Sequence, residues 1–291
     1  MSKLATSMAA QRRLGLGIKL VITVLTALYA LYPVAWVLSA ALDPANSLVN
    51  QSLIPRNATL DNFARLVNDP QHPFVLWLWN SIKVSGISAV IIVALTALAA
   101  YSFSRLRYRG RRAGLLAILL VQLFPNTLAL VSLFLLLKQV GNIIPWLGLN
   151  THGGLILIYS GGALGFNTWL MKGYFDTIPH ELDEAALIDG ATHFQVFRHI
   201  LLPLVRPILA VIGILSFIGT YSDFLLARVM LKSTENYTLA VGMTLFIRGQ
   251  YTREWGVFAA AALIGALPIV LIFLVLQRQL IGGLSRGAVK G

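Results

Sequence analysis

Six long apolar runs constrain this chain more than any other feature of its sequence. They cover approximately residues 18–42, 75–103, 114–137, 154–171, 207–226 and 257–276. Apolar runs of about 18 or more residues predict transmembrane helices, because a helix needs about 20 residues to cross the hydrocarbon layer. Only 12% of the residues are charged, against about 25% in soluble domains. The sequence therefore predicts an all-α membrane protein with six transmembrane helices.

Basic residues indicate how these helices are oriented. Lys and Arg accumulate in cytoplasmic loops, and five arginines lie within residues 105–112, directly after the second run. If both termini are cytoplasmic, 15 of the 23 Lys and Arg residues lie inside and seven outside. The net charge of +12 is then explained by basic residues at the membrane surface, and we expect no nucleic-acid partner. A cleaved signal peptide is the alternative for the first run, but an apolar stretch of that length favours an uncleaved anchor.

A polar stretch, residues 179–203, interrupts the apolar pattern in the predicted cytoplasmic loop after the fourth run. Pro179 and three acidic residues suit the start of a helix, with Leu182, Ala185 and Ala186 as its apolar face. Asp189-Gly190 predicts a break. Thr192 and Gln195 form a capping-box pattern for a second helix, which has Phe194, Phe197 and Leu201 along one side and ends at Pro203. A rigid amphipathic helix pair of this kind is expected to dock into another protein.

Polar residues within the runs are candidates for a translocation path. Gln122 and Asn126 are predicted i, i+4 neighbours on one face of a helix kinked at Pro125, where they either bond to other helices or border the path. Asn167 is the one strongly polar residue of the fourth run. Asp223 lies near the outer end of the fifth run and faces either a polar cavity or solvent.

The sequence contains no motif for catalysis. His180-Glu181 lacks the second histidine of a zinc-protease HExxH, and neither a G-x-S-x-G elbow nor a phosphate-binding P-loop occurs. The chain has no cysteine, which excludes disulfides and thiolate metal sites. We therefore do not expect enzyme activity in this chain.

The spacing of the polar stretch resembles a known family. Glu184-Ala185-Ala186, then Gly190, then Ile200-x-Leu202-Pro203 is similar to the EAA loop of bacterial ABC-importer permeases. Stretches at 76–81, 150–154, 237–243 and 287–291 further resemble the maltose-type branch of the carbohydrate-uptake group. The resemblance implies a type I ABC importer permease fold in the bacterial inner membrane. It implies a first segment at 1–76, a permease core at 77–281 with the coupling loop at about 176–203, and a cytoplasmic tail at 282–291.

The resemblance also implies partners. These are a homologous second permease, a dimer of cytoplasmic ATPase subunits, an extracytoplasmic solute-binding protein and membrane lipid. ATP and Mg would bind the ATPase subunits, so no cofactor is expected in this chain. The loop at 236–254 would contact the binding protein. The residues expected to couple to the ATPase are Glu184, Ala185, Ala186, Asp189, Gly190, Ile200, Leu202 and Pro203.

The resemblance thus implies an ATP-driven permease subunit for an oligosaccharide or disaccharide, such as a maltodextrin or trehalose-like sugar. A permease for another solute, such as a polyol or glycerol phosphate, is the alternative within the same family. A secondary transporter is a further alternative, but it predicts internal repeats and intramembrane charges, and the sequence shows neither clearly.

Overall fold

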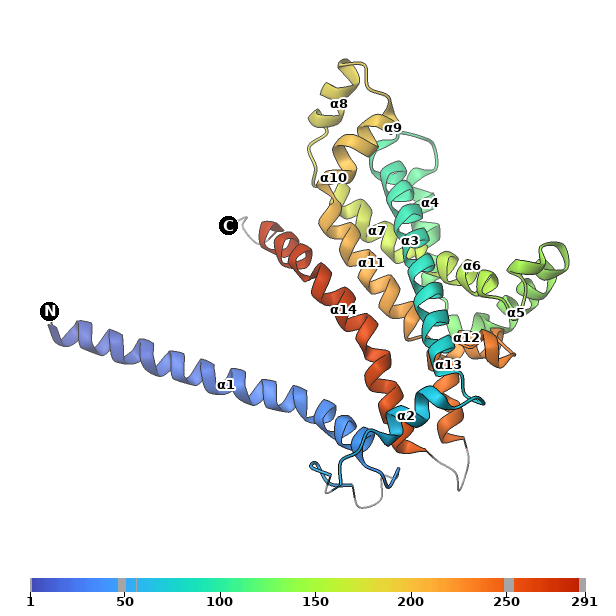
Figure 1. Cartoon of the computed structure of the whole chain (residues 1–291). Helices are drawn as coiled ribbons and strands as arrows, with labels where there is room; N and C mark the ends of the chain where they lie inside the picture. Colours follow the sequence, from blue (N-terminus) through green and yellow to red (C-terminus); the bar gives the residue numbers. More distant parts are fainter. Residues whose placement is uncertain (1, 47–50, 56, 249–253, 288–291) are drawn as a thin grey trace. The chain divides into compact units, whose positions relative to one another are not determined.

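The computed structural model describes residues 2–46, 51–55, 57–248 and 254–287, and for 2–14, 126 and 278–287 it describes the backbone only. These residues form helices and loops, and no strand occurs among them (Figure 1). The end of the tail at 288–291 and part of the outer loop at 249–253 lie outside the described residues. The predicted all-helical class is therefore confirmed.

The predicted spans divide into continuous and broken helices. Three described helices are long and apolar enough to cross a membrane, at Gly15–Leu42, Phe74–Arg105 and Trp255–Gln277. Three bent pairs pass the same test, so the described chain has up to six spans if each pair counts as one. The pairs are Arg111–Gln122 with Thr127–Ile143, bent by 104°, His152–Gly162 with Leu164–Phe175, bent by 48°, and His193–Leu204 with Arg206–Tyr221, bent by 78°.

One compact unit comprises residues 1–70 and 245–264. It contains α1 (Ser2–Leu42), α2 (Asp61–Asn68) and the first turns of α14 (Trp255–Gly287). Between Leu16 and Val34 the large apolar side chains of α1 are exposed, as suits a helix surrounded by lipid. Asn62 donates hydrogen bonds to the carbonyls of Ala41 and Asp43 at the end of α1. Asn46 Oδ1 accepts from the amides of Gly256 and Val257, which satisfies the first turn of α14.

The second unit, residues 71–244 and 265–291, is built around α3 (Phe74–Arg105). Small side chains line its buried face, so neighbouring helices can approach closely; they include Ser81, Ser85, Ser88, Ala89, Thr96, Ala97, Ala100 and Ser104. Against it pack α6 (His152–Gly162), α7 (Leu164–Phe175) and α11 (Arg206–Tyr221). Figure 1 shows α3 at the centre of this group. The other long helices of the unit are α4 (Arg111–Gln122) and α5 (Asn126–Ile143).

Short elements close the Phe74 end of α3. They are two 3₁₀ turns, Pro145–Leu147 and Thr234–Asn236, and the helices α12 (Leu225–Met230) and α13 (Leu239–Met243). A further 3₁₀ turn, Thr244–Ile247, follows α13. Asn150, in the left-handed region at φ 58°, accepts through Oδ1 from the amides of Lys232 and Ser233. Its carbonyl accepts from Asn236 Nδ2. This residue therefore joins two loops that are far apart in sequence.

The expectation that both Trp77 and Trp79 mark the membrane interface is wrong for Trp77. Trp79 is exposed, but Trp77 is fully buried, and its indole N–H donates to the carbonyl of Thr234 at 2.9 Å. A Cβ added at Gly242 would overlap the Trp77 ring, so α13 can lie on the indole only because residue 242 has no side chain.

We therefore expect Gly242→Ala to destabilise this end of the protein by about 1–3 kcal/mol, because the rigid indole has no room to shift. The thermal unfolding midpoint in detergent should fall by several degrees. Gly86→Ala in α3 is the matched control, since nothing lies within 4 Å of its Cβ position. Equal midpoints for the two variants would contradict this packing.

Candidate coupling site

The polar stretch forms the predicted helix, break and second helix. α8 (Glu181–Ile188) has three acidic residues in its first turn, where the helix dipole favours negative charge. Gly190 lies at φ 86° and ends α8. Its amide donates to the carbonyl of Leu187, and the amide of Ala191 donates to that of Ala186. This pair of bonds is a Schellman motif, which requires a left-handed residue, and glycine adopts that conformation without strain.

The second helix begins at the predicted capping box. Thr192 accepts from the Gln195 amide, and the Gln195 side chain accepts from the Thr192 amide at 2.7 Å. α9 (His193–Gln195) continues into a π-helical segment, Val196–Leu201, and α10 (Leu202–Leu204). The prediction that Pro203 ends the helix is wrong, because the helix extends one residue further and the 78° bend falls at Val205.

The expected apolar face of α8 is also corrected. Leu182 and Ala185 are exposed and Ala186 is only half-buried, whereas the buried residue of this helix is Asp183. In the second helix Phe197 and Leu201 are buried as predicted, but Phe194 is exposed. α8 is thus held to the protein through a charged side chain, and most of its apolar side chains remain uncovered.

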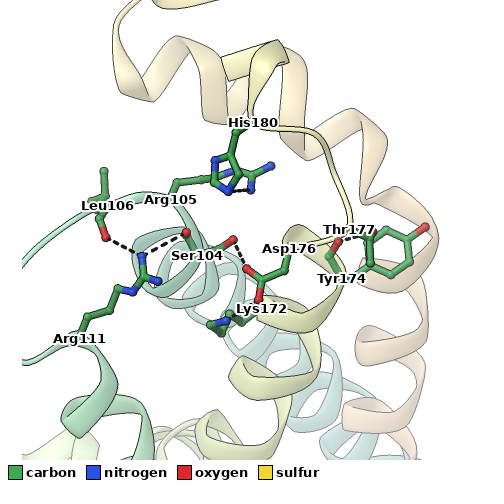
Figure 2. Close-up of polar contacts among 9 residues, drawn as sticks. All are labelled: Ser104, Arg105, Leu106, Arg111, Lys172, Tyr174, Asp176, Thr177 and His180. Atoms are coloured by element: carbon green, nitrogen blue, oxygen red, sulfur yellow. Dashed lines mark hydrogen bonds and ion pairs between the residues drawn. The ribbon is translucent and has the colours of Figure 1, made fainter. Parts of the chain in front are cut away.

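Arg105, the last residue of α3, is the partner of Asp183. Its Nε lies 2.6 Å from Asp183 Oδ2, and the two side chains are 4% and 12% exposed. Arg105 also donates to the carbonyl of Ile178 at 2.8 Å and lies 3.2 Å from His180 Nε2. Figure 2 shows the guanidinium beside the His180 ring. Burial raises the pKa of the Asp183 carboxyl, and the Arg105 charge opposes that rise, so Asp183 depends on Arg105 to stay ionised.

Two further contacts join α3 to the loop that contains α8. Ser104 Oγ donates to Asp176 Oδ1 at 2.7 Å, and Lys172 bonds to the same carboxylate (Figure 2). Burial disfavours the Asp176 charge, but the hydrogen bonds from Lys172 and Ser104 outweigh it, so the pKa of Asp176 is lowered. Tyr101 Oη donates to the carbonyl of His193 at 3.1 Å. The end of α3 therefore fixes both helices of the polar stretch.

The opposite side of this helix pair is an exposed apolar surface. Leu187 is partly exposed, Ile188 is 85% exposed and Phe194 is 61% exposed. Glu184, Asp189 and Gly190 of the predicted coupling set are exposed around them. Of the remaining set, Ile200 and Leu202 are half-buried and Pro203 is exposed. An apolar patch with a polar rim on a rigid support is typical of a protein-docking surface.

The candidate path residues separate into two groups. Asn167 and Asp223 line one cavity of about 540 Å³. Gln122 does not: its Nε2 donates to the carbonyl of Gly162 at 2.7 Å. The predicted i, i+4 pairing of Gln122 with Asn126 is wrong, because the helix is interrupted between them at residues 123–125. The side chain of Asn126 lies outside the described residues.

The profile of the family described as "Binding-protein-dependent transport system inner membrane component" matches residues 92–285, about two thirds of the chain. The chain belongs to this family of permeases. The permease is 46% identical over 272 residues to the maltose/maltodextrin transport system permease protein MalG of Vibrio vulnificus (strain YJ016), a match that covers 90% of this chain and 91% of the relative. MalG of Escherichia coli (strain K12) is 44% identical over the same length and covers the same shares.

A solved structure agrees with this assignment. The permease matches a chain of a bacterial ABC transporter involved in the import of the acidic polysaccharide alginate, with a TM-score of 0.76 and 26% identity. The match covers 91% of this chain and 96% of that chain. The predicted inner-membrane permease fold is therefore confirmed.

Sequence reasoning missed the Arg105–Asp183 pair. Arg105 is the first of five arginines that indicate a cytoplasmic loop, and Asp183 is one of three acidic residues at a helix start. Each has a sufficient local explanation, so nothing in the sequence connects them. One signal could have distinguished Arg105: it directly follows the apolar run, so its side chain lies near other helix ends rather than in open solvent.

We expect Arg105→Met to loosen the loop of the permease by about 3 kcal/mol or more, because Asp183 is left buried without a counter-charge. Asp183→Leu should also loosen it, whereas the double variant should lose less than the sum of the two. Hydrogen exchange of the amides of α8 measures this local opening. Additive effects of the two substitutions would show that the pair contributes no coupling energy.

Proposed function

We propose that this permease forms half of the translocation path of an ATP-driven importer for maltodextrin-type oligosaccharides, and that residues 179–203 couple it to an ATPase. Family membership makes it a multi-pass inner-membrane component of a transport system that depends on a binding protein. Two relatives at 44–46% identity are maltose/maltodextrin permeases, which supports the choice of solute. In the working assembly a homologous second permease completes the path and a pair of ATPase subunits binds ATP and Mg.

One observation carries the coupling role. The helix pair is fixed to α3 on one side by Arg105, while Ile188 and Phe194 are exposed on the other. Uncovered apolar side chains on a firmly held element favour a protein partner, because burying them there stabilises the complex without first ordering the loop. Glu184 is exposed within the same surface and provides a charged contact. The coupling set named from the sequence is therefore proposed as the ATPase interface.

The mechanism requires two states that both partners influence. When the ATPase subunits close around ATP, the docked helix pair moves with them, and its bonds to Tyr101, Ser104 and Arg105 transmit the movement to α3. α3 packs against α6, α7 and α11, so the bundle changes with it. A solute-loaded binding protein must favour the same state, or its arrival does not affect ATP hydrolysis.

We expect Gly190→Trp to abolish uptake while the protein still inserts and assembles its bundle. Nothing lies within 4 Å of a Cβ at Gly190, so within this chain the variant strains only the backbone, and the damage arises where the indole meets the ATPase. The measurement is maltose uptake by cells that produce all the partners, with membrane levels of the variant checked by immunoblot.

Gly110→Trp is the matched control, because Gly110 has the same φ of 86° and equally open surroundings. It lies before α4, outside the proposed interface, so its uptake should stay close to that of the unmodified protein. Normal uptake by a stably inserted Gly190→Trp protein would contradict the coupling role, and so would equal loss in both variants.

A further inference from the structure

A cavity of about 540 Å³ lies in the second unit. Its wall is mostly apolar, with Leu130 of α5 and Phe166 of α7 among its residues. Polar side chains from several elements reach it: Tyr159 of α6, Asn167 of α7, Ser216 and Thr220 of α11, and Asp223 after α11. A few convergent polar groups in an apolar cavity of this size are typical of a small-molecule site.

Two broken spans meet at this cavity. The break between α6 and α7 places Gly162 and Ala163 in its wall, and Thr127, just after the break between α4 and α5, also lines it. Gln122 donates to the Gly162 carbonyl and so satisfies an acceptor at the break. Interrupted helices at membrane depth occur where backbone is buried in protein or lines a cavity, and in transporters they border solute sites. Two of them at one cavity indicate a site rather than a packing defect.

The polar groups of the cavity are arranged to receive hydrogen bonds and to donate them. Asp223 Oδ1 accepts from Tyr159 Oη at 2.8 Å and from the Ala227 amide at 3.0 Å, which fixes the carboxylate. Among the described residues both bonds use Oδ1, so Oδ2 is the oxygen that can accept from a ligand. Ser216 is 8% exposed, and within the described chain its Oγ has no hydrogen-bond partner. A buried hydroxyl without a partner is costly unless a ligand supplies one.

We propose that this cavity is a binding subsite for one sugar unit of a neutral oligosaccharide, with Asn167, Ser216 and Asp223 as its hydrogen-bonding residues. The proposal rests on the proposed function and adds direct solute contact by this chain. Sugar hydroxyls are both donors and acceptors, which matches a carboxylate, an amide and a hydroxyl. The apolar wall suits the C–H faces of a sugar ring. The Asp223 charge disfavours a uronate unit, whose carboxylate would be repelled.

The test compares alanine variants in the complete transporter, reconstituted in proteoliposomes with its ATPase subunits, second permease and binding protein. Ser216→Ala and Asn167→Ala should each lower the initial rate of maltotriose uptake about fivefold, as expected for one lost hydrogen bond. Detergent thermal stability should not fall in Ser216→Ala, since that change removes a buried hydroxyl that lacks a partner. Stimulation of ATP hydrolysis by the loaded binding protein should persist.

Ser160→Ala is the matched control. Ser160 is 6% exposed, its Oγ also lacks a partner within the described chain, and it does not line the cavity. Its uptake should equal that of the unmodified complex. Equal uptake by Ser160→Ala, Ser216→Ala and Asn167→Ala would overturn the subsite while leaving the proposed function intact. Weaker co-purification of the second permease with unchanged uptake would also overturn it, and would show that the cavity is a subunit contact. An unmodified complex that imports no neutral sugar would overturn the proposed function, and the subsite with it.

Discussion

The buried ion pair between Arg105 and Asp183 is the interaction on which the coupling account depends. It joins the last residue of α3 to a helix that otherwise presents exposed side chains, and it does so where water is largely excluded. A buried pair of this kind contributes specificity more than net stability, since replacing both partners costs little and removing one costs much. Its consequence here is orientation: α8 is held at one angle to α3, and its apolar side chains are left for a partner. α3 has 32 residues and so is about 48 Å long. Movement at Arg105 can therefore reach the short elements at its other end.

The broken spans give the bundle its interior. A transmembrane helix satisfies its own backbone, so each interruption must be compensated by a side chain or by the environment. Gln122 provides one compensation through its bond to Gly162. The remaining polar groups gather at the cavity, where Tyr159 and the Ala227 amide hold Asp223 in place. The same helices thus pack along α3 and enclose the cavity, which links the position of α3 to the shape of the cavity wall.

The sequence predicts the parts of this structure that local chemistry determines. Apolar runs gave the spans, and Thr192, Gln195 and Gly190 gave the capping box and the turn, because each depends on neighbours within a few residues. Pro125 indicated a disturbance in the third span but not a full break, since a kink and a break share the same residue type. The Asp183–Arg105 and Asp223–Tyr159 contacts could not be predicted, because each joins helices whose pairing is set by packing of the whole unit. Burial of Asp183 in place of Leu182 follows from that packing and overrides the apolar pattern.

The central claim is that residues 179–203 face the cytoplasm and contact the ATPase. Since the chain has no cysteine, a single one placed at Ile188 carries a thiol-directed photo-crosslinker at one site only. The account predicts an ATPase adduct from residue 188 in the assembled transporter, and none from a cysteine at Val131, which is exposed on α5. Reaction of the cysteine at 188 with a membrane-impermeant reagent added outside intact cells would contradict it, as would crosslinking that never includes an ATPase subunit.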